Sequence, residues 1–130
     1  METEEGIMNH EEFNQVVEEQ YRQSKKTLMK KADEYAQGDD RFWNFRRAAQ
    51  VLGTTPEKAL LGMFVKHMVS IMDIVELTAK GQGISPRELI DEKITDAVNY
   101  LLLLKGMLIG RINAVDLKKR FQHSTTTKGE

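Results

Sequence analysis

Apolar residues recur every three or four positions through most of the chain, which is the period of an amphipathic α-helix. Asn9 followed by Glu12 is a typical helix start. The helix that begins there is expected to run from about His10 to Ala36. One stripe of apolar positions marks its buried face: Phe13, Val16, Val17, Tyr21, Leu28 and Met29. The remaining positions are mostly charged, so we expect this helix to bury one face only.

Turn and cap signals divide the next part of the chain. A short helix is expected over Arg41–Leu52, and Gly53 follows it at a position where helices commonly end in the left-handed conformation. Thr54, three residues before a glutamate, and Pro56 then predict the start of a third helix. This helix is expected to reach about Lys80, where a glycine follows.

The third and last helical segments are apolar on nearly all sides, which is typical of helices that are covered by neighbours. Ser85 and Pro86 open the last segment, which is expected to end near Leu117. No alternating strand pattern competes with the helical one. The sequence therefore predicts an all-α fold, a bundle of about four helices of which two are strongly apolar.

The length of 130 residues corresponds to one domain. We expect a flexible N-terminus over 1–8, a single helical domain over 9–118 and a flexible C-terminal tail over 119–130. Because so small a bundle has little interior for two apolar helices, we expect a homo-oligomer, a dimer or higher, built on the third and last helices. Gly106 and Gly110, four apart on the last helix, would let another backbone approach.

Composition excludes several classes of function. Nineteen Lys and Arg against 20 Asp and Glu give a net charge of −1, so there is no strong nucleic-acid signal. The chain has no cysteine, which excludes disulfides, thiol nucleophiles and cysteine-bound zinc. The N-terminus is acidic, and Lys105 interrupts the most apolar stretch far short of the ~20 residues of a membrane span. We therefore expect a cytoplasmic protein without a membrane partner.

Polar residues inside the two apolar helices are the most informative positions. On the third helix Lys66, Ser70 and Asp73 share one face, and His67 lies beside them. The last helix has a similar polar face: Glu92, Asp96, Asn99 and Tyr100. A buried charge is costly unless it is paired. Two interpretations stay open: Lys66 pairs with Asp96 or Glu92 across the helices, or the polar seam is a pocket for a polar ligand or a metal.

The segment 41–47 contains three aromatic residues, three arginines and an asparagine. In a purely structural interpretation its phenylalanines anchor the short helix and its arginines are solvated. In a functional interpretation Trp43 stacks on a nucleobase, while Arg46 or Arg47 contacts a phosphate.

Several motifs together resemble a known family: Lys31-Ala32-Asp33-Glu34-Tyr35, Asp40, Asn44-Phe45 and Asp96-Ala97-Val98-Asn99-Tyr100-Leu101. Over about residues 31–108 the chain resembles small phage and prophage helical proteins described as nucleotide-modification-associated. Through them it is similar to the MazG-like all-α nucleoside triphosphate pyrophosphohydrolases. This resemblance implies a helical oligomer with a nucleotide pocket, in the cytoplasm of a bacterial host, in which two carboxylate pairs hold Mg²⁺.

The sequence departs from the family pattern at the metal site. Glu92 and Asp96 stand four residues apart where the second carboxylate pair has a spacing of three. Lys66 and Ser70 stand where the first pair is expected, and a lysine that faces carboxylates pairs with them instead of a metal. We therefore predict a phage-type protein that binds or sequesters a nucleotide, including a host signalling nucleotide.

Two alternatives stay open beside this prediction. One is a Mg²⁺-dependent nucleoside triphosphate pyrophosphohydrolase with Glu92 and Asp96 as metal ligands. The other is a structural interaction protein whose polar seam is a buried ion-pair network. The predicted nucleotide-binding residues are Trp43, Asn44, Arg46, Arg47, Lys66, Ser70, Asp96, Asn99 and Tyr100.

Overall fold

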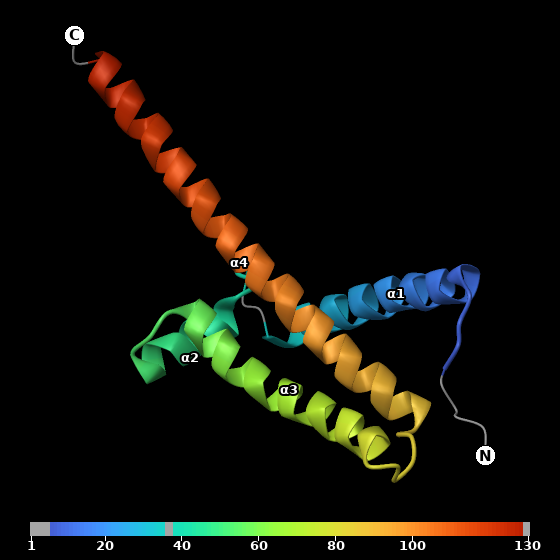
Figure 1. Cartoon of the computed structure of the whole chain (residues 1–130). Helices are drawn as coiled ribbons and strands as arrows, with labels where there is room; N and C mark the ends of the chain where they lie inside the picture. The colour runs from blue at the N-terminus through green and yellow to red at the C-terminus, as the bar shows by residue number, and fades with distance from the viewer. Residues whose placement is uncertain (1–5, 36–37, 129–130) are drawn as a thin grey trace.

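The computed structural model of the chain describes residues 6–35 and 38–128, and Figure 1 shows that helices make up nearly all of it. The elements are α1 His10–Tyr35, α2 Trp43–Leu52, α3 Pro56–Ala79 and α4 Arg87–Lys128. No strand occurs in the described part of the chain. The predicted all-α class with four helices is confirmed.

Two predicted helix ends have the expected geometry. The backbone N–H of Glu12 donates to Oδ1 of Asn9 at 2.8 Å, so Asn9 caps the start of α1. Gly53 ends α2 with φ 66°, and its N–H donates to the carbonyl of Ala49. Only glycine adopts this left-handed conformation without a steric cost, which explains its place here.

The cap of α3 lies one residue later than the sequence predicts. Thr55, and not Thr54, accepts a hydrogen bond from the backbone N–H of Lys58, at 3.2 Å. Pro56 occupies the first helical position, where its missing N–H costs nothing. The residue before that position must be the cap, so the proline decides between the two threonines.

The last helix is much longer than predicted. α4 has 42 residues and continues past Leu117 to Lys128. The segment 111–128 contains neither glycine nor proline, so nothing in it stops a helix. In Figure 1 its C-terminal half projects away from the other three helices. The predicted flexible ends include residues 1–5 and 129–130, which lie outside the described residues, and their flexibility stays a prediction.

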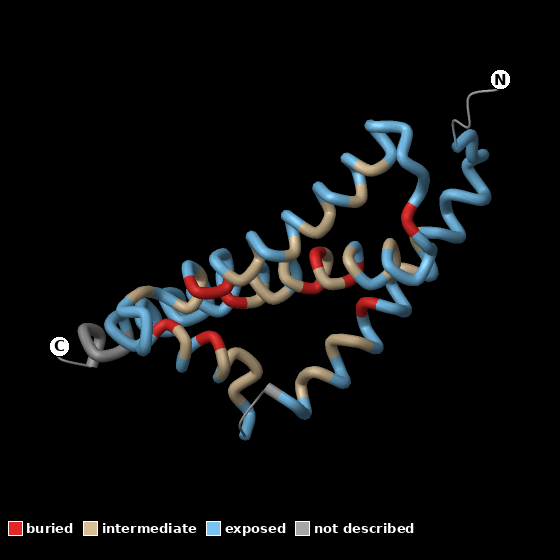
Figure 2. Tube along the Cα trace, turned by 90° about the horizontal axis from the view of Figure 1, so that it is seen from below, coloured by how far each residue is buried: buried red, intermediate tan, exposed pale blue. Residues whose placement is uncertain are grey.

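The N-terminal half of α4 is the element on which the others assemble. α3 packs antiparallel along it, α2 packs against α3, and α1 packs against α4 (Figure 1). The core consists of Phe45, Leu60 and Met107, from α2, α3 and α4. Figure 2 shows that buried positions are confined to short stretches where the helices meet.

Polar side chains attach α1 to α4. The amide of Gln20 donates to the hydroxyl of Ser24 at 2.9 Å and to the hydroxyl of Thr95 at 3.0 Å. Ser24 and Thr95 are both buried, so these hydrogen bonds satisfy groups that water does not reach. At the first residue of α4, Arg87 forms an ion pair with Glu19 of α1 at 2.9 Å.

Gly106 has a packing role within the chain. A Cβ atom at this position would lie 3.0 Å from Cζ of Phe42, so the glycine lets that ring rest directly on α4. A Cβ atom at Gly110 would meet no atom outside the helix backbone within 4 Å. Within the chain, the close neighbour of Gly106 is a side chain, and the approach of another backbone to the glycine pair stays a prediction.

Among the described residues, α4 is long and apolar enough to cross a membrane, judged by length and composition alone. Core helices of water-soluble proteins meet the same criterion. The sequence pattern placed a charge in its most apolar stretch, and the absence of a membrane partner stays a prediction.

Candidate functional site

A cavity of about 260 Å³ lies between the C-terminal half of α1, the start of α2, and α3 and α4. Its volume is close to the lower end of the roughly 300–1,000 Å³ typical of small-molecule sites. The apolar part of its lining consists of Leu28, Phe45, Met63 and Leu103. The polar part consists of Lys31, Arg41, Asn44, Asp96, Asn99 and Tyr100.

Two asparagines in this lining have buried polar atoms without a hydrogen-bond partner. Asn99 is only 5% exposed, and neither its Oδ1 nor its Nδ2 has a partner within the described residues. Oδ1 of Asn44 is also buried and has no hydrogen-bond partner within the described residues. An unpaired buried group of this kind costs about 1–3 kcal/mol, and native proteins contain few of them. Both residues line the cavity, but these atoms have almost no accessible surface in the ligand-free chain, so a ligand pairs with them only when the lining side chains move.

A cluster of charged groups borders the cavity on one side. Asp96 of α4 has Nζ of Lys31 from α1 at 3.8 Å and Nδ1 of His67 from α3 at 3.6 Å. The structural interpretation of the sequence expected Lys66 to pair with Asp96 or Glu92. Lys66 is exposed, and within residues 6–35 and 38–128 no ion pair joins it to Asp96 or Glu92. The cation across the helices is Lys31 instead.

This environment disfavours the protonated form of His67. Burial lowers the pKa of His67 below its ordinary value, the carboxylate of Asp96 opposes this effect, and the charges of Lys31, Lys93 and Lys66 add to it. Its ring also contacts Tyr100, with the ring centroids 4.6 Å apart.

The lowered pKa of His67 predicts a pH-dependent stability. As the pH falls through the ordinary histidine value of about 6.5, the unfolded chain takes up this proton before the folded one. The free energy of unfolding should therefore decrease with falling pH and level off once the folded protein is protonated as well. Urea unfolding between about pH 8 and 5 should show this trend, and His67→Gln should lose part of it. An unchanged trend in His67→Gln, but a changed one in the control His10→Gln at the start of α1, would contradict the assignment.

Arg41 is the cation of the cavity that no carboxylate neutralises within the described residues. Nη2 of its guanidinium donates to the carbonyl of Leu28 at 3.3 Å, which holds the side chain against α1. Burial lowers the pKa of Arg41, but a guanidinium stays charged in proteins. A planar cation with further N–H donors is suited to bind phosphate or carboxylate.

Aromatic rings complete the cavity. Phe45 and Tyr100 both line it, and their rings meet edge to face with the centroids 6.2 Å apart. Phe64 contacts Tyr100 from α3, with the centroids 6.1 Å apart. These contacts fix the Tyr100 ring in the wall, where a flat ligand can lie against it.

The structure brings four of the predicted nucleotide-binding residues together around the cavity: Asn44, Asp96, Asn99 and Tyr100. The other five do not line it: Trp43, Arg46, Arg47, Lys66 and Ser70. Arg46 pairs with Asp40 at 2.8 Å, and the hydroxyl of Ser70 donates to the carbonyl of Lys66 at 3.3 Å. Successive residues of a helix point in different directions, so segment 41–47 directs only some of its side chains to one site.

The predicted metal ligands lie beside the cavity. Glu92 and Asp96 line a shallow hollow together with Asp91 on the side of α1. Glu92 is exposed, with Lys93 at 3.9 Å, while Asp96 faces Lys31 and His67. The described residues contain no group of three His, Asp or Glu side chains that could hold a metal ion. Within one chain the donor set does not fit the Mg²⁺ site that the family resemblance implies, so no metal-dependent step is assigned to it.

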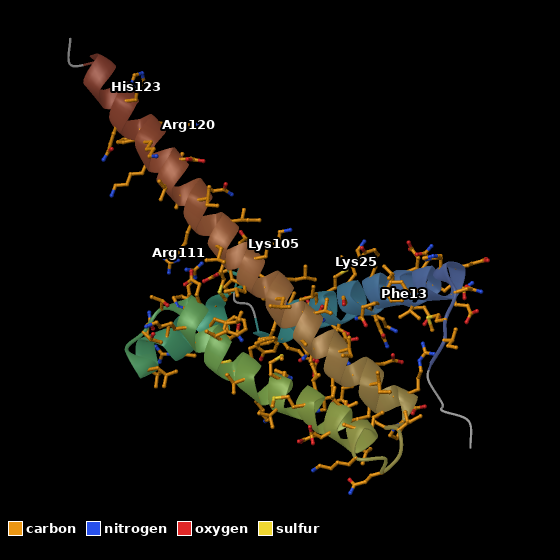
Figure 3. All side chains as sticks on the ribbon, in the orientation of Figure 1. Phe13, Lys25, Lys105, Arg111, Arg120 and His123 are labelled. Carbon is orange, nitrogen blue, oxygen red and sulfur yellow. The ribbon has the colours of Figure 1, made fainter. Side chains whose placement is uncertain are left out.

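A second hollow, of about 290 Å³, has charges that are already paired. It lies between the starts of α2 and α3 and the middle of α4. Arg111, marked in Figure 3, reaches Glu57 of α3 with both its Nε and its Nη2, the latter at 2.8 Å from Oε1. This hydrogen bonding lowers the pKa of Glu57. With its ions paired, the hollow offers less to a polar ligand than the cavity with its two asparagines.

Comparison of the chain with protein-family models, with curated proteins and with solved structures found no match. The site is therefore interpreted from its own chemistry.

Proposed function

We propose that the chain binds a nucleotide in the cavity between α1, α2, α3 and α4 and holds it without cleaving it. The observation that supports this proposal most is the buried amide of Asn99, whose oxygen and nitrogen both lack a partner. A buried amide without partners destabilises the protein by itself. A ligand that pairs with both atoms of Asn99 would remove this cost, which explains why an asparagine stands at this position.

The other groups of the cavity suit the parts of a nucleotide. A nucleobase presents donors and acceptors side by side on its edge, which matches the amides of Asn99 and Asn44. Its flat face can lie against the ring of Tyr100. Arg41 supplies the positive charge that a phosphate group requires.

Binding without cleavage is favoured by the state of the carboxylates. Cleavage of a triphosphate by this type of enzyme needs cations that bridge phosphate oxygens and activate water. Asp96, the carboxylate nearest the cavity, faces Lys31 and His67 instead. Sequestration of a nucleotide, including a signalling nucleotide of a bacterial host, agrees with the resemblance to phage proteins.

The two alternative functions each have one observation in their favour. The hollow lined by Asp91, Glu92 and Asp96 favours a hydrolase, because a second chain could complete its ligand set. The contacts of Asp96 with Lys31 and His67 join three helices and favour a structural ion-pair seam.

One experiment separates these functions. Thermal unfolding is measured with linear and cyclic nucleotides, with and without Mg²⁺, and each nucleotide is then analysed by chromatography. We expect a rise in melting temperature, because a ligand at 100 times its Kd adds about 2.7 kcal/mol, and recovery of the nucleotide intact. Release of monophosphate and pyrophosphate would establish the hydrolase instead. No shift with any nucleotide would leave the structural seam.

Arg41 should contribute more to the affinity than the arginines of α2. Loss of a charge-assisted hydrogen bond costs roughly 1.5–3 kcal/mol, so Arg41→Gln should weaken nucleotide binding about tenfold or more. Arg47→Gln is the matched control, since Arg47 is exposed and interacts only weakly with Gln50, at 3.5 Å. Isothermal titration calorimetry measures both. Equal affinities of Arg41→Gln and the unmodified protein would exclude Arg41 from the site.

A further inference from the structure

The single chain exposes far more surface than a folded monomer of its size. Its accessible surface is 10627 Å². A monomeric protein of 14.9 kDa is expected to expose about 7,000 Å². The excess of about 3,600 Å² exceeds the roughly 1,000–2,500 Å² that each partner of an obligate homodimer buries.

Part of this surface is a regular stripe on α3, which we call the α3 stripe. It consists of Leu61, Val65, Met68, Met72 and Val75, all exposed. Their spacings of four, three, four and three residues are those of the a and d positions of a heptad repeat. A seam of this kind on a soluble helix normally packs against another helix.

A second regular stripe runs along α4, which we call the α4 stripe. It consists of Ile94, Leu101, Leu108, Ile112 and Val115, all exposed. Four of them follow one another at intervals of seven residues, and Lys105 occupies a position equivalent to that of Ile112. Figure 3 marks Lys105 in the middle of the helix, near the point where α4 leaves the other helices.

The two stripes face the same side of the molecule. Each stripe lies one residue after core positions on its helix. On α3, Leu61 follows the core residue Leu60, and on α4, Leu108 follows the core residue Met107. One residue turns the direction by about 100° around each axis. Because α3 and α4 run antiparallel (Figure 1), these equal turns bring both stripes to one face of the pair.

The opposite face of the α3–α4 pair is covered by α1. Lys31 and Gln20 of α1 reach Asp96 and Thr95 on α4, which lie on the other side of that helix from the α4 stripe. The face with the stripes has no such cover within the described residues.

We propose that a second copy of this chain covers both stripes, so that α3 and α4 of two protomers form a four-helix bundle. The matched heptad spacing of the stripes and the size of the excess surface favour a helical partner of the same kind. A lipid bilayer fits less well: the apolar positions form a one-sided stripe, and Lys105 in its middle would be costly in hydrocarbon, whereas a single lysine is tolerated in a seam between helices and can set its register. The proposal does not depend on nucleotide binding.

The oligomeric state of the full chain tests this proposal. Sedimentation in detergent-free buffer should give at least twice the 14.9 kDa mass of one chain. Met72→Glu and Leu108→Glu should each reduce the mass to that of one chain or leave a chain that no longer folds. Val51→Glu is the control, because Val51 is 77% exposed at the end of α2 and belongs to neither stripe, and it should leave the assembly unchanged.

A second readout covers the case in which the charged variants fail to fold. The chain has no cysteine, so a single introduced cysteine is the only thiol that can react. The Met68→Cys and Leu108→Cys thiols should react with an alkylating reagent roughly tenfold more slowly than the Val51→Cys thiol. A single-chain mass with equally reactive thiols would overturn the proposal. So would a chain that is dispersed only with lipid vesicles or detergent, which would assign the stripes to a lipid surface. Both results should be the same with and without nucleotide, so a failure to bind nucleotide leaves them intact.

Discussion

Replacing Asn99 by leucine is expected to stabilise the ligand-free protein and to abolish its response to nucleotides. The amide of Asn99 is buried and unpaired, and its removal relieves a cost of about 1–3 kcal/mol. The same change removes the group that is proposed to recognise the base. Thermal unfolding with and without nucleotide measures both effects. A gain in stability together with a loss of binding is the mark of a residue retained for its function.

Thr95→Val is the matched control for Asn99→Leu. Thr95 is buried one turn earlier on the same helix, but its hydroxyl accepts a hydrogen bond from Gln20 at 3.0 Å. Its removal should therefore cost about 1 kcal/mol and leave nucleotide binding unchanged. If Asn99→Leu destabilised the protein as Thr95→Val does, and kept its nucleotide response, Asn99 would be a structural residue.

The second large effect is expected at the centre of the core. Leu60 is 1% exposed and packs with Phe45 and Met107, so Leu60→Ala should lower the free energy of unfolding by about 2–5 kcal/mol. That is a large part of the 5–15 kcal/mol typical of a whole domain. Urea unfolding monitored by circular dichroism measures the loss.

The next residue on α3 provides the comparison. Leu61 is 52% exposed in the single chain, so Leu61→Ala should cost the fold of one protomer little. If a second copy covers the α3 stripe, Leu61→Ala should instead increase the protein concentration at which the assembly dissociates. Equal losses at Leu60 and Leu61 in dilute protein would contradict the position of the core.

The helices were predictable where a local signal begins or ends them. Asn9 and Gly53 act through their own side chain or backbone, so the sequence alone identifies them. The end of α4 was not predictable in this way. A polar composition suggests a tail, but glycine and proline are the strongest local stop signals for a helix, and 111–128 contains neither.

The site was predictable to the extent that its residues are unusual for their surroundings. Asp96, Asn99 and Tyr100 stand out because they are polar positions on an otherwise apolar helix. Lys31 begins a motif of the family resemblance and Arg41 belongs to the segment 41–47, but neither pattern assigns these side chains to the cavity. Their place at the cavity depends on how α1 and the start of α2 are rotated against α4, which tertiary packing decides.

The same reason explains why Lys31, and not Lys66, faces Asp96. Lys66 lies on α3 at a position that the pattern places on the polar face with Ser70. In the structure His67, one residue on, turns toward α4 and occupies that place. One residue corresponds to a turn of about 100° around the helix axis, and the spacing of polar residues does not determine which of two neighbours faces the adjacent helix.

The central claim is that the cavity holds an intact nucleotide through Asn99. Isothermal titration of the unmodified protein and of Asn99→Leu, with the nucleotide that gives the largest thermal shift and chromatography of the nucleotide afterwards, tests it most directly. We predict saturable binding by the unmodified protein, none by Asn99→Leu, and a nucleotide that is recovered uncleaved. Equal binding by both proteins, or recovery of monophosphate and pyrophosphate, would contradict the account.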